Sequence, residues 1–331
     1  MSQASHTIEV EIGADSVADW LRETLEEQTP GLADSVSWVD VLRAGPKRLA
    51  IVALRDGRRL ALKQYPDQRG ALTNRWLRRL TAAGFTEPSR FRVTSARGWS
   101  PARRTLLADV APGSPWSEWV GRDLAGRVQT AVAAAEWLLA LQRLPVSLED
   151  RSDYRSVGEM RGEVRRLAVI FPDRQDEFEG IRHDVAGVLA GKPVRLVPSH
   201  GDLHPQNLWI LDGPSPAVTA LDLDTAGFRR PSYDVGYAVA MLLVSSWMNT
   251  GDFRAGADLA EAFWNRWLKE GQDAAAVPAE VARALVQSLH FELVTYRTGE
   301  LRILPRWLRL ARAALDDGIQ SMLSEARRVY A

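Results

Sequence analysis

The chain has 331 residues with 42 basic and 42 acidic side chains, so its formal net charge is zero. No strong field for a nucleic acid or a membrane surface is implied, and the absence of cysteine excludes disulfides, thiolate metal sites and cysteine nucleophiles. The length favours two domains or lobes; a polar stretch at residues 1–10 and the lack of a bilayer-length apolar run favour a cytoplasmic protein.

The first elements predicted along the chain are one helix and three strands. The helix covers residues 15–27, with Ser16 as its expected cap, and Pro30-Gly31 ends it. The strands are marked by alternating or β-branched residues and by the turn Arg55-Asp-Gly57, which predicts a hairpin. They cover residues 37–43, 49–54 and 58–65.

Two basic features of this region are candidates for binding an anion. Lys63 interrupts an apolar strand, and an unpaired ammonium would be costly to bury there, so the side chain needs a partner or a ligand. The connection at residues 44–48 ends in Lys47 and Arg48 and contains one glycine and one proline. This loop is therefore either a phosphate contact or a plain hairpin turn.

A helix at residues 68–84 and a strand pair complete the first part of the chain. The helix contains no aspartate or glutamate. Residues 91–94 and 105–110 are predicted to pair as strands joined by residues 95–104. The stretch at residues 109–116 contains Pro112, Gly113 and Pro115, which mark a boundary.

The rest of the chain is predominantly helical. A helix at residues 124–144 is expected to bury the face formed by Val128, Val132, Ala135 and Leu139. Ser232 is the expected cap of a helix that runs to about residue 247. Twelve tryptophans favour aromatic core packing. Further helices are predicted at residues 153–170, 176–190, 256–270, 278–301 and 305–329.

One stretch concentrates the residues that carry chemistry. Residues 198–210 read Pro-Ser-His-Gly-Asp-Leu-His-Pro-Gln-Asn-Leu-Trp-Ile, and residues 217–224 read Ala-Val-Thr-Ala-Leu-Asp-Leu-Asp. Carboxylate and amide oxygens in such clusters suit a hard cation such as Mg²⁺. Because imidazoles also bind transition metals, a metal-dependent hydrolase using His200, Asp202, His204 and Asp222 is an alternative.

The order of these residues resembles a phosphoryl-transfer site. A kinase catalytic loop has His-x-Asp with an Asn five residues after the Asp, as His200, Asp202 and Asn207 have here. Together with Leu-Asp-Leu-Asp and Pro-Ser-Tyr-Asp-Val-Gly, the pattern resembles the aminoglycoside phosphotransferase / choline kinase family. The resemblance is dense over residues 198–243 and traceable over about the first 145 residues.

This resemblance implies an α+β, two-lobed protein-kinase-like fold. A nucleotide-binding lobe with an antiparallel sheet and a leading helix would cover residues 1–108, and a mainly helical lobe with the catalytic loop and substrate site residues 115–331. Residues 109–114 would form the hinge, where Asp109, Val110 and Ala111 hold the adenine with main-chain groups.

The resemblance also implies roles for the motif residues. Asp202 would be the catalytic base, and His200 would brace its loop. Mg²⁺ would be held by Asn207 and Asp222, while Asp224 would support the metal or the loop. Family members often carry an acid where Arg230 stands, so a basic residue there is expected to alter the substrate side.

The nucleotide-binding strand departs from the kinase pattern. Lys63 would bind the α- and β-phosphates of the nucleotide, but the following helix lacks the acid that faces this lysine in kinases. Thr73 or Asn74 stands in the expected position, so Lys63 needs another acid such as Asp222 or Glu87.

The predicted function is Mg²⁺-dependent transfer of the γ-phosphoryl group of ATP or GTP to a small-molecule hydroxyl. An aminoglycoside-like compound, an amino alcohol or a sugar fits as acceptor, and neither a nucleic acid nor a membrane is expected as a partner. The sequence favours no oligomeric state. The sparse phosphate loop and the missing helix acid leave a nucleotide-binding pseudokinase with a regulatory role as an alternative.

Overall fold

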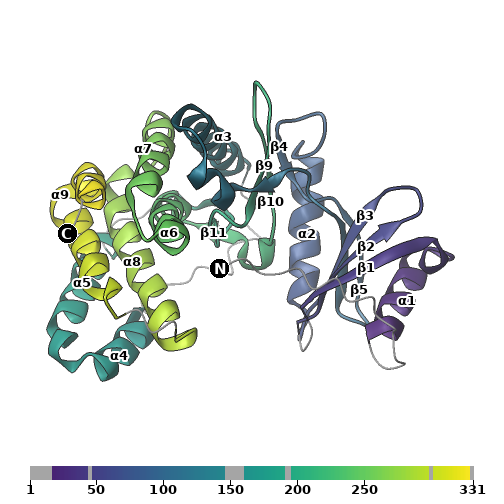
Figure 1. The fold of residues 1–331 in the computed structure, drawn as a ribbon, viewed down its shortest axis with the longest axis horizontal. Helices are drawn as coiled ribbons and strands as arrows, with labels where there is room; N and C mark the ends of the chain where they lie inside the picture. Colours follow the sequence, from purple (N-terminus) through teal and green to yellow (C-terminus); the bar gives the residue numbers. More distant parts are fainter. Residues whose placement is uncertain (1–16, 44–46, 146–159, 191–194, 298–300, 329–331) are drawn as a thin grey trace. The chain divides into compact units, whose positions relative to one another are not determined.

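A computed structural model describes residues 17–43, 47–145, 160–190, 195–297 and 301–328 of the chain (Figure 1). The chain forms two compact units. The first contains the residues up to Pro112 together with Thr219–Asp224, and the second contains Gly113–Val218 and the residues from Thr225 onward. The short segment Thr219–Asp224 thus leaves the second unit and contributes to the first.

The first unit is built on a five-stranded antiparallel sheet whose strand order is β1-β2-β3-β6-β5. Alternate residues of β2 and β3 are buried, as the two-residue period of a strand requires. They pack with Trp20, Leu21 and Leu25 of the helix α1, which lies against the sheet in Figure 1. The elements of this unit are α1 (Val17–Gln28), β1 (Val36–Arg43), β2 (Leu49–Leu54), β3 (Arg59–Gln64), α2 (Arg69–Ala82), β4 (Phe91–Val93), β5 (Ala96–Ser100) and β6 (Thr105–Asp109).

The predicted pairing of residues 91–94 with residues 105–110 is wrong. The presumed connection contains a strand of its own, β5, which turns back through a tight loop and pairs with β6. Because β6 lies between β5 and β3, it has no edge left for β4. The amide after β4, that of Thr94, instead donates to the carbonyl of Ala220.

The second unit is mainly helical around a core of aromatic side chains. Four of its tryptophans, Trp116, Trp137, Trp267 and Trp307, are fully buried. Two short antiparallel pairs accompany the helices: β7 with β9, and β8 with β11. The elements are β7 (Ser114–Pro115), α3 (Leu124–Gln142), α4 (Met160–Ile170), α5 (Gln175–Leu189), β8 (Val197–Ser199), β9 (Leu208–Leu211), β10 (Ala217–Ala220, which ends in the first unit), β11 (Gly227–Arg229), α6 (Ser232–Thr250), α7 (Arg254–Leu268), α8 (Val277–His290) and α9 (Ile303–Arg327).

Two details of the helices differ from the sequence predictions. Ala135 and Leu139 of the expected face of α3 are buried, but Val128 is exposed, and Ala131, Ala134 and Leu138 outside that face are buried too, so the helix is enclosed on several sides. Ser232 does not cap α6 but is its first residue, and its hydroxyl donates to Asp273.

Other predicted features are confirmed, with small differences in extent. Eight of the twelve tryptophans are buried, as core packing requires. The helix expected at residues 278–301 is shorter, since α8 gives way to a π-helical turn at Phe291–Thr295.

Ser16 and residues 153–159 of two predicted helices lie outside the described residues. Within the described ranges, no helix is long and apolar enough to cross a bilayer.

Candidate active site

The catalytic-loop motif connects β8 to β9 in the second unit. His200 follows β8 directly, is fully buried and places its ring edge-on to that of Trp137, with centroids 6.1 Å apart. Gly201 has a φ of +82°, and a Cβ there would overlap the carbonyl of Thr225. Only glycine fits a left-handed turn with so close a backbone neighbour. Gly201 therefore determines the backbone conformation of the loop just before Asp202.

Asp234 fixes the same loop from the first turn of α6. Its two carboxylate oxygens accept from the amides of His200 (2.8 Å) and Gly201 (2.9 Å), and the side chain is 1% exposed. Hydrogen bonds to a buried carboxylate are among the stronger ones in proteins. These contacts give Asp234 a structural role in the catalytic loop.

Asp202 presents an oriented, partly exposed carboxylate. The hydroxyl of Tyr237 donates to Oδ1 (2.8 Å), and the amide of Asn207 donates to Oδ2 (3.3 Å) and to the backbone carbonyl (3.0 Å). Burial and the neighbouring charge of Asp202 hold the pKa of Tyr237 well above its usual value, so the phenol stays a donor. A carboxylate oriented in this way can accept a proton from a substrate hydroxyl.

The side chain of Asn207 is also oriented by these contacts. It is buried, and its Nδ2 group faces Asp202. The amide oxygen is then the atom available to a hard cation.

The histidines of the loop take part in local hydrogen bonds. Nδ1 of His200 accepts from the amide of Asp202 (3.3 Å), and Nδ1 of His204 accepts from the amide of Gln206 (3.2 Å). In the part of the chain that the structure describes, no group of three or more metal-binding side chains comes together. His200, Asp202 and His204, which the hydrolase alternative would use, thus form no such group in this loop.

The second group of candidate residues lies in the first unit, around Lys63 on β3. Its ammonium is 2.8 Å from Oδ1 of Asp222 and 2.7 Å from Oδ2 of Asp224. Burial alone would lower the pKa of Lys63, but the charges of the two aspartates more than offset it and raise the pKa above its usual value. Asp222 pairs with Lys63 as predicted, and Asp224 does so as well, while Glu87 pairs with Arg92 instead.

Asp224 is held by two further donors. The hydroxyl of Tyr65 (2.7 Å) and that of Thr73 (3.1 Å) both donate to its Oδ1. Burial and the charge of Asp224 raise the pKa of Tyr65 far above its usual value. Asp222 has a φ of +53°, a conformation uncommon for residues other than glycine and often found at functional sites.

The predicted hinge residues are already partly engaged. The Asp109 carboxylate forms a bidentate pair with Arg97 (2.7 and 2.8 Å), and its amide donates to the carbonyl of Ser95. The amide of Val110 donates to the carbonyl of Arg59. Adenine contacts in this segment would thus fall to carbonyl oxygens or to the amide of Ala111.

The basic loop before β2 is only partly described, since residues 44–46 lie outside the described residues. Lys47 is exposed. The guanidinium of Arg48 lies over the ring of Trp20, 5.8 Å from its centroid, and so contributes to the packing of α1. Arg230 is likewise structural: it is buried and pairs with Asp273 at 2.9 Å.

A comparison with known protein families decides the class of this site. The sequence profile described as "Phosphotransferase enzyme family" matches residues 49–279, which include the sheet, the catalytic loop and the Asp222 segment. The chain belongs to the phosphotransferase enzyme family. No curated protein sequence matches it significantly.

Solved structures share the fold of this phosphotransferase at low sequence identity. A choline/ethanolamine kinase family protein from Mesorhizobium loti has a TM-score of 0.62 and 16% identity over 93% of this chain and 98% of that one. The aminoglycoside phosphotransferase APH(2″)-IIia, solved with GDP and kanamycin, has a TM-score of 0.59 and 13% identity over 91% and 98%. The amicoumacin kinase hAmiN, solved with AMP-PNP, Ca²⁺ and Ami, has a TM-score of 0.56 and 15% identity over 86% and 90%. The expected family, the α+β protein-kinase-like fold and the phosphotransferase class are thereby confirmed.

Some residues that shape this phosphotransferase site were not found from the sequence. Tyr65 directly follows β3 and lies two residues after Lys63, so the alternation of the strand continued by one residue predicts both side chains on one side. Tyr237 lies one helical turn after Asp234, so both face the catalytic loop. These spacings are the signals that could have identified them, whereas the contact of Thr73 with Asp224 depends on tertiary packing.

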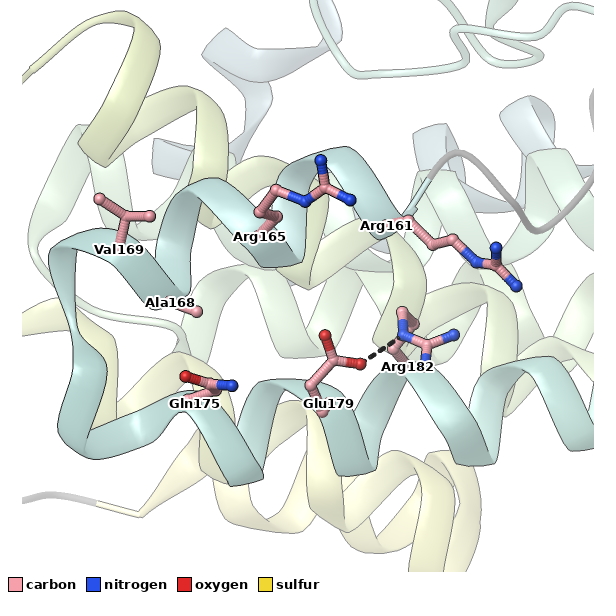
Figure 2. Close-up of a pocket in the computed structure, with 7 residues that line it drawn as sticks. All are labelled: Arg161, Arg165, Ala168, Val169, Gln175, Glu179 and Arg182. Atoms are coloured by element: carbon pink, nitrogen blue, oxygen red, sulfur yellow. Dashed lines mark hydrogen bonds and ion pairs between the residues drawn. The ribbon is translucent and has the colours of Figure 1, made fainter.

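The phosphotransferase also has a basic surface cavity of about 380 Å³ between α4 and α5, apart from the candidate residues. Figure 2 shows Arg161 and Arg165 projecting from α4, and Glu179 paired with Arg182 on α5 at 2.6 Å. With three guanidinium groups and one carboxylate, the lining suits an anionic group better than a cationic acceptor. None of the predicted site residues lines this cavity.

Proposed function

We propose that this phosphotransferase transfers the γ-phosphoryl group of ATP or GTP to a hydroxyl of a small molecule, with Asp202 as the catalytic base and Mg²⁺ as the required cation. The observation that carries the proposal is the carboxylate of Asp202, oriented by Tyr237 and Asn207 in a loop anchored by Asp234. Positioning and electrostatics supply most of the catalysis in such reactions.

The reaction needs one proton acceptor. The acceptor oxygen forms a bond to the γ-phosphorus while the bond from that phosphorus to the β–γ bridging oxygen breaks, and the nucleoside diphosphate leaves. The hydroxyl proton passes to Asp202 and from there to solvent. A partly exposed carboxylate suits both steps because it can reach the substrate and exchange its proton with water.

Mg²⁺ would be held by the oxygens of Asn207 and Asp222. Both are hard ligands, and few protein ligands are needed because Mg²⁺ in such sites keeps substrate phosphates and water in its coordination shell. The Nδ2 group of Asn207 donates to Asp202, which leaves the amide oxygen for the cation. The Asp222 side chain is 41% exposed, so a cation can reach it. When bound, the cation neutralises phosphate charge; Lys63 neutralises charge on the α- and β-phosphates.

The acceptor class and the nucleotide rest on the relatives. Proteins with this fold include a choline/ethanolamine kinase family protein, an aminoglycoside phosphotransferase solved with GDP and kanamycin, and a kinase solved with AMP-PNP. They support an amino alcohol or an aminoglycoside-like compound as acceptor and are consistent with either ATP or GTP; a sugar is kept as an acceptor from the sequence prediction.

The test is a transfer assay with γ-labelled ATP or GTP, Mg²⁺ and a panel of amino alcohols, aminoglycosides and sugars. We expect Asp202→Asn to lower the rate of transfer by about 10²–10⁴-fold. Its affinity for nucleotide should stay near that of the unaltered protein. Asp212→Asn is the matched control, since Asp212 is exposed and pairs only loosely with Arg122 at 3.4 Å.

Two results would contradict the proposal. Retained turnover in Asp202→Asn would exclude Asp202 as the base. Nucleotide binding without transfer to any acceptor would instead favour the pseudokinase with a regulatory role, the alternative motivated by the absence of an acid on α2.

A further inference from the structure

The geometry points to Asp224 as the residue that positions Lys63 for nucleotide binding, in place of the acid that helix α2 lacks. This inference rests on the proposed function, because it gives Lys63 a nucleotide to bind. It also replaces the metal-binding role predicted for Asp224 from the sequence with a positioning role.

Helix α2 offers Lys63 no acidic partner. The helix covers Arg69–Ala82 and has no acidic residue, whereas kinases place a glutamate on the corresponding helix, paired with the strand lysine. Here the side chain that α2 contributes is the hydroxyl of Thr73, which carries no charge to pair with the lysine and donates to Asp224 instead. In this chain the carboxylate that pairs with the lysine is that of Asp224, on the segment after β10, and α2 supplies the hydroxyl of Thr73 that donates to it.

The carboxylate of Asp224 accepts hydrogen bonds from three donors. Oδ2 accepts from Lys63 at 2.7 Å, and Oδ1 accepts from Tyr65 at 2.7 Å and from Thr73 at 3.1 Å. Tyr65 and Thr73 are each 2% exposed. If Asp224 turned toward a cation, the Tyr65 hydroxyl would lose its acceptor without access to water, and the Thr73 hydroxyl would keep only the longer bond to the carbonyl of Arg69 at 3.3 Å. Leaving a buried donor unsatisfied is costly, and these contacts therefore oppose metal coordination by Asp224.

The two aspartates that contact Lys63 differ in exposure. The Asp222 side chain is 41% exposed, whereas that of Asp224 is 20% exposed. An accessible carboxylate suits a cation that arrives with the nucleotide, and an enclosed one suits a fixed partner. Lys63 is further confined by the ring of Tyr65, whose centroid lies 5.1 Å from the ammonium. Asp224 and Tyr65 together thus set where the ammonium points.

The inference is tested by moving the carboxylate to the helix. Asp224→Asn removes the fixed charge, and the double variant Asp224→Asn with Thr73→Glu places an acid on α2, where kinases have it. Asp222→Asn serves as the metal-site comparison, and Asp67→Asn, an exposed site just before α2, is the matched control. The readouts are the dissociation constant of a fluorescent ATP analogue, its dependence on Mg²⁺ concentration, and the KM for ATP against kcat.

We expect Asp224→Asn to weaken nucleotide binding about tenfold or more, the effect of losing one hydrogen bond to a charged group. The Mg²⁺ concentration for half-saturation should stay unchanged, whereas Asp222→Asn should raise it. Thr73→Glu in the double variant should restore most of the lost affinity, which neither a metal ligand nor a merely structural residue would allow. Tyr65→Phe, which removes one donor and keeps the ring, should weaken binding less than Asp224→Asn.

Three results would overturn the inference. In the first, Asp224→Asn raises the Mg²⁺ requirement as Asp222→Asn does, and Thr73→Glu restores nothing, which would make Asp224 a metal ligand. In the second, Asp224→Asn and Tyr65→Phe bind nucleotide like Asp67→Asn, which would refute the positioning role and leave the proposed function intact. In the third, the unaltered protein binds no nucleotide, and the proposed function falls with the inference.

Discussion

Asp234→Asn is the substitution that most directly tests how the catalytic loop is held. The two bonds that Asp234 accepts, from the amides of His200 and Gly201, are both buried. An asparagine has one oxygen and one NH₂ group, so it can accept only one of these bonds and turns a donor toward the other amide. The substitution keeps the volume of the side chain and changes only its hydrogen bonding.

The expected loss of stability follows from these contacts. A hydrogen bond to a charged group contributes about 1.5–3 kcal/mol, and a buried donor left without a partner costs about 1–3 kcal/mol. Because both effects involve the same amide, they overlap, and we expect the free energy of unfolding to fall by about 2–4 kcal/mol. With an m-value of about 3 kcal/mol/M, the midpoint of urea unfolding falls by about 1 M.

Urea unfolding followed by tryptophan fluorescence measures this loss, since Trp137 contacts the ring of His200. The transfer assay should show a lower kcat for the same variant, because the loop carries Asp202. Asp212→Asn is again the control, with an expected change below about 0.5 kcal/mol for an exposed pair. A loss in Asp234→Asn no larger than in this control would refute the idea that Asp234 anchors the loop.

Two further predictions concern the second unit. Gly113→Ala should destabilise the protein by about 2–4 kcal/mol in urea unfolding, because Gly113 has a φ of +92° and a Cβ would overlap the carbonyl of Ile210 on β9; Gly187→Ala, on the open face of α5, should cause no loss. His290→Gln should lose less stability than the unaltered protein when the pH is lowered from 8 to 5, as measured by thermal unfolding. Burial and the charge of Arg166 lower the pKa of His290 in the folded protein. The stability that depends on a neutral His290 is therefore fully present above about pH 6.5 and is lost as the pH falls through the lowered pKa. If His290→Gln loses as much stability on acidification as the unaltered protein, His290 is not the source of that loss.

Much of the fold could be predicted because its signals are local. The Arg55-Asp-Gly57 turn and the alternation in β2 and β3 predicted the hairpin, and Pro112 and Gly113 lie where the first unit gives way to the second. The error at β4 has a different cause. Residues 96–100 resemble a connection by composition, and their pairing with β6 depends on a tight turn and on an open sheet edge. Neither condition can be read from single-residue preferences.

The candidate site was predictable where spacing along the chain carries the chemistry. Asp202 and Asn207 are five residues apart in one loop, and the structure joins them by hydrogen bonds. The partners that orient them are far away in the sequence. Tyr237 lies 35 residues beyond Asp202, and only its spacing from Asp234 on the same helix distinguishes it from the other tyrosines. Contacts of this kind follow from helix packing and not from local pattern.

The missing helix acid shows how a local departure from a family pattern can be compensated elsewhere. A kinase lysine needs a fixed negative charge, but that charge does not have to come from the helix that usually bears it. In this chain the helix offers a hydroxyl, Thr73, and the segment after β10 offers the carboxylate of Asp224 that the hydroxyl binds. The carboxylate thus lies on the segment after β10 instead of on the helix. Lys63 still pairs with a carboxylate, and buried hydroxyl groups hold that carboxylate in place. The absence of an acid on α2 is therefore weak evidence for a pseudokinase, and Thr73→Glu combined with Asp224→Asn is the direct test of whether the position of the charge or only its presence matters.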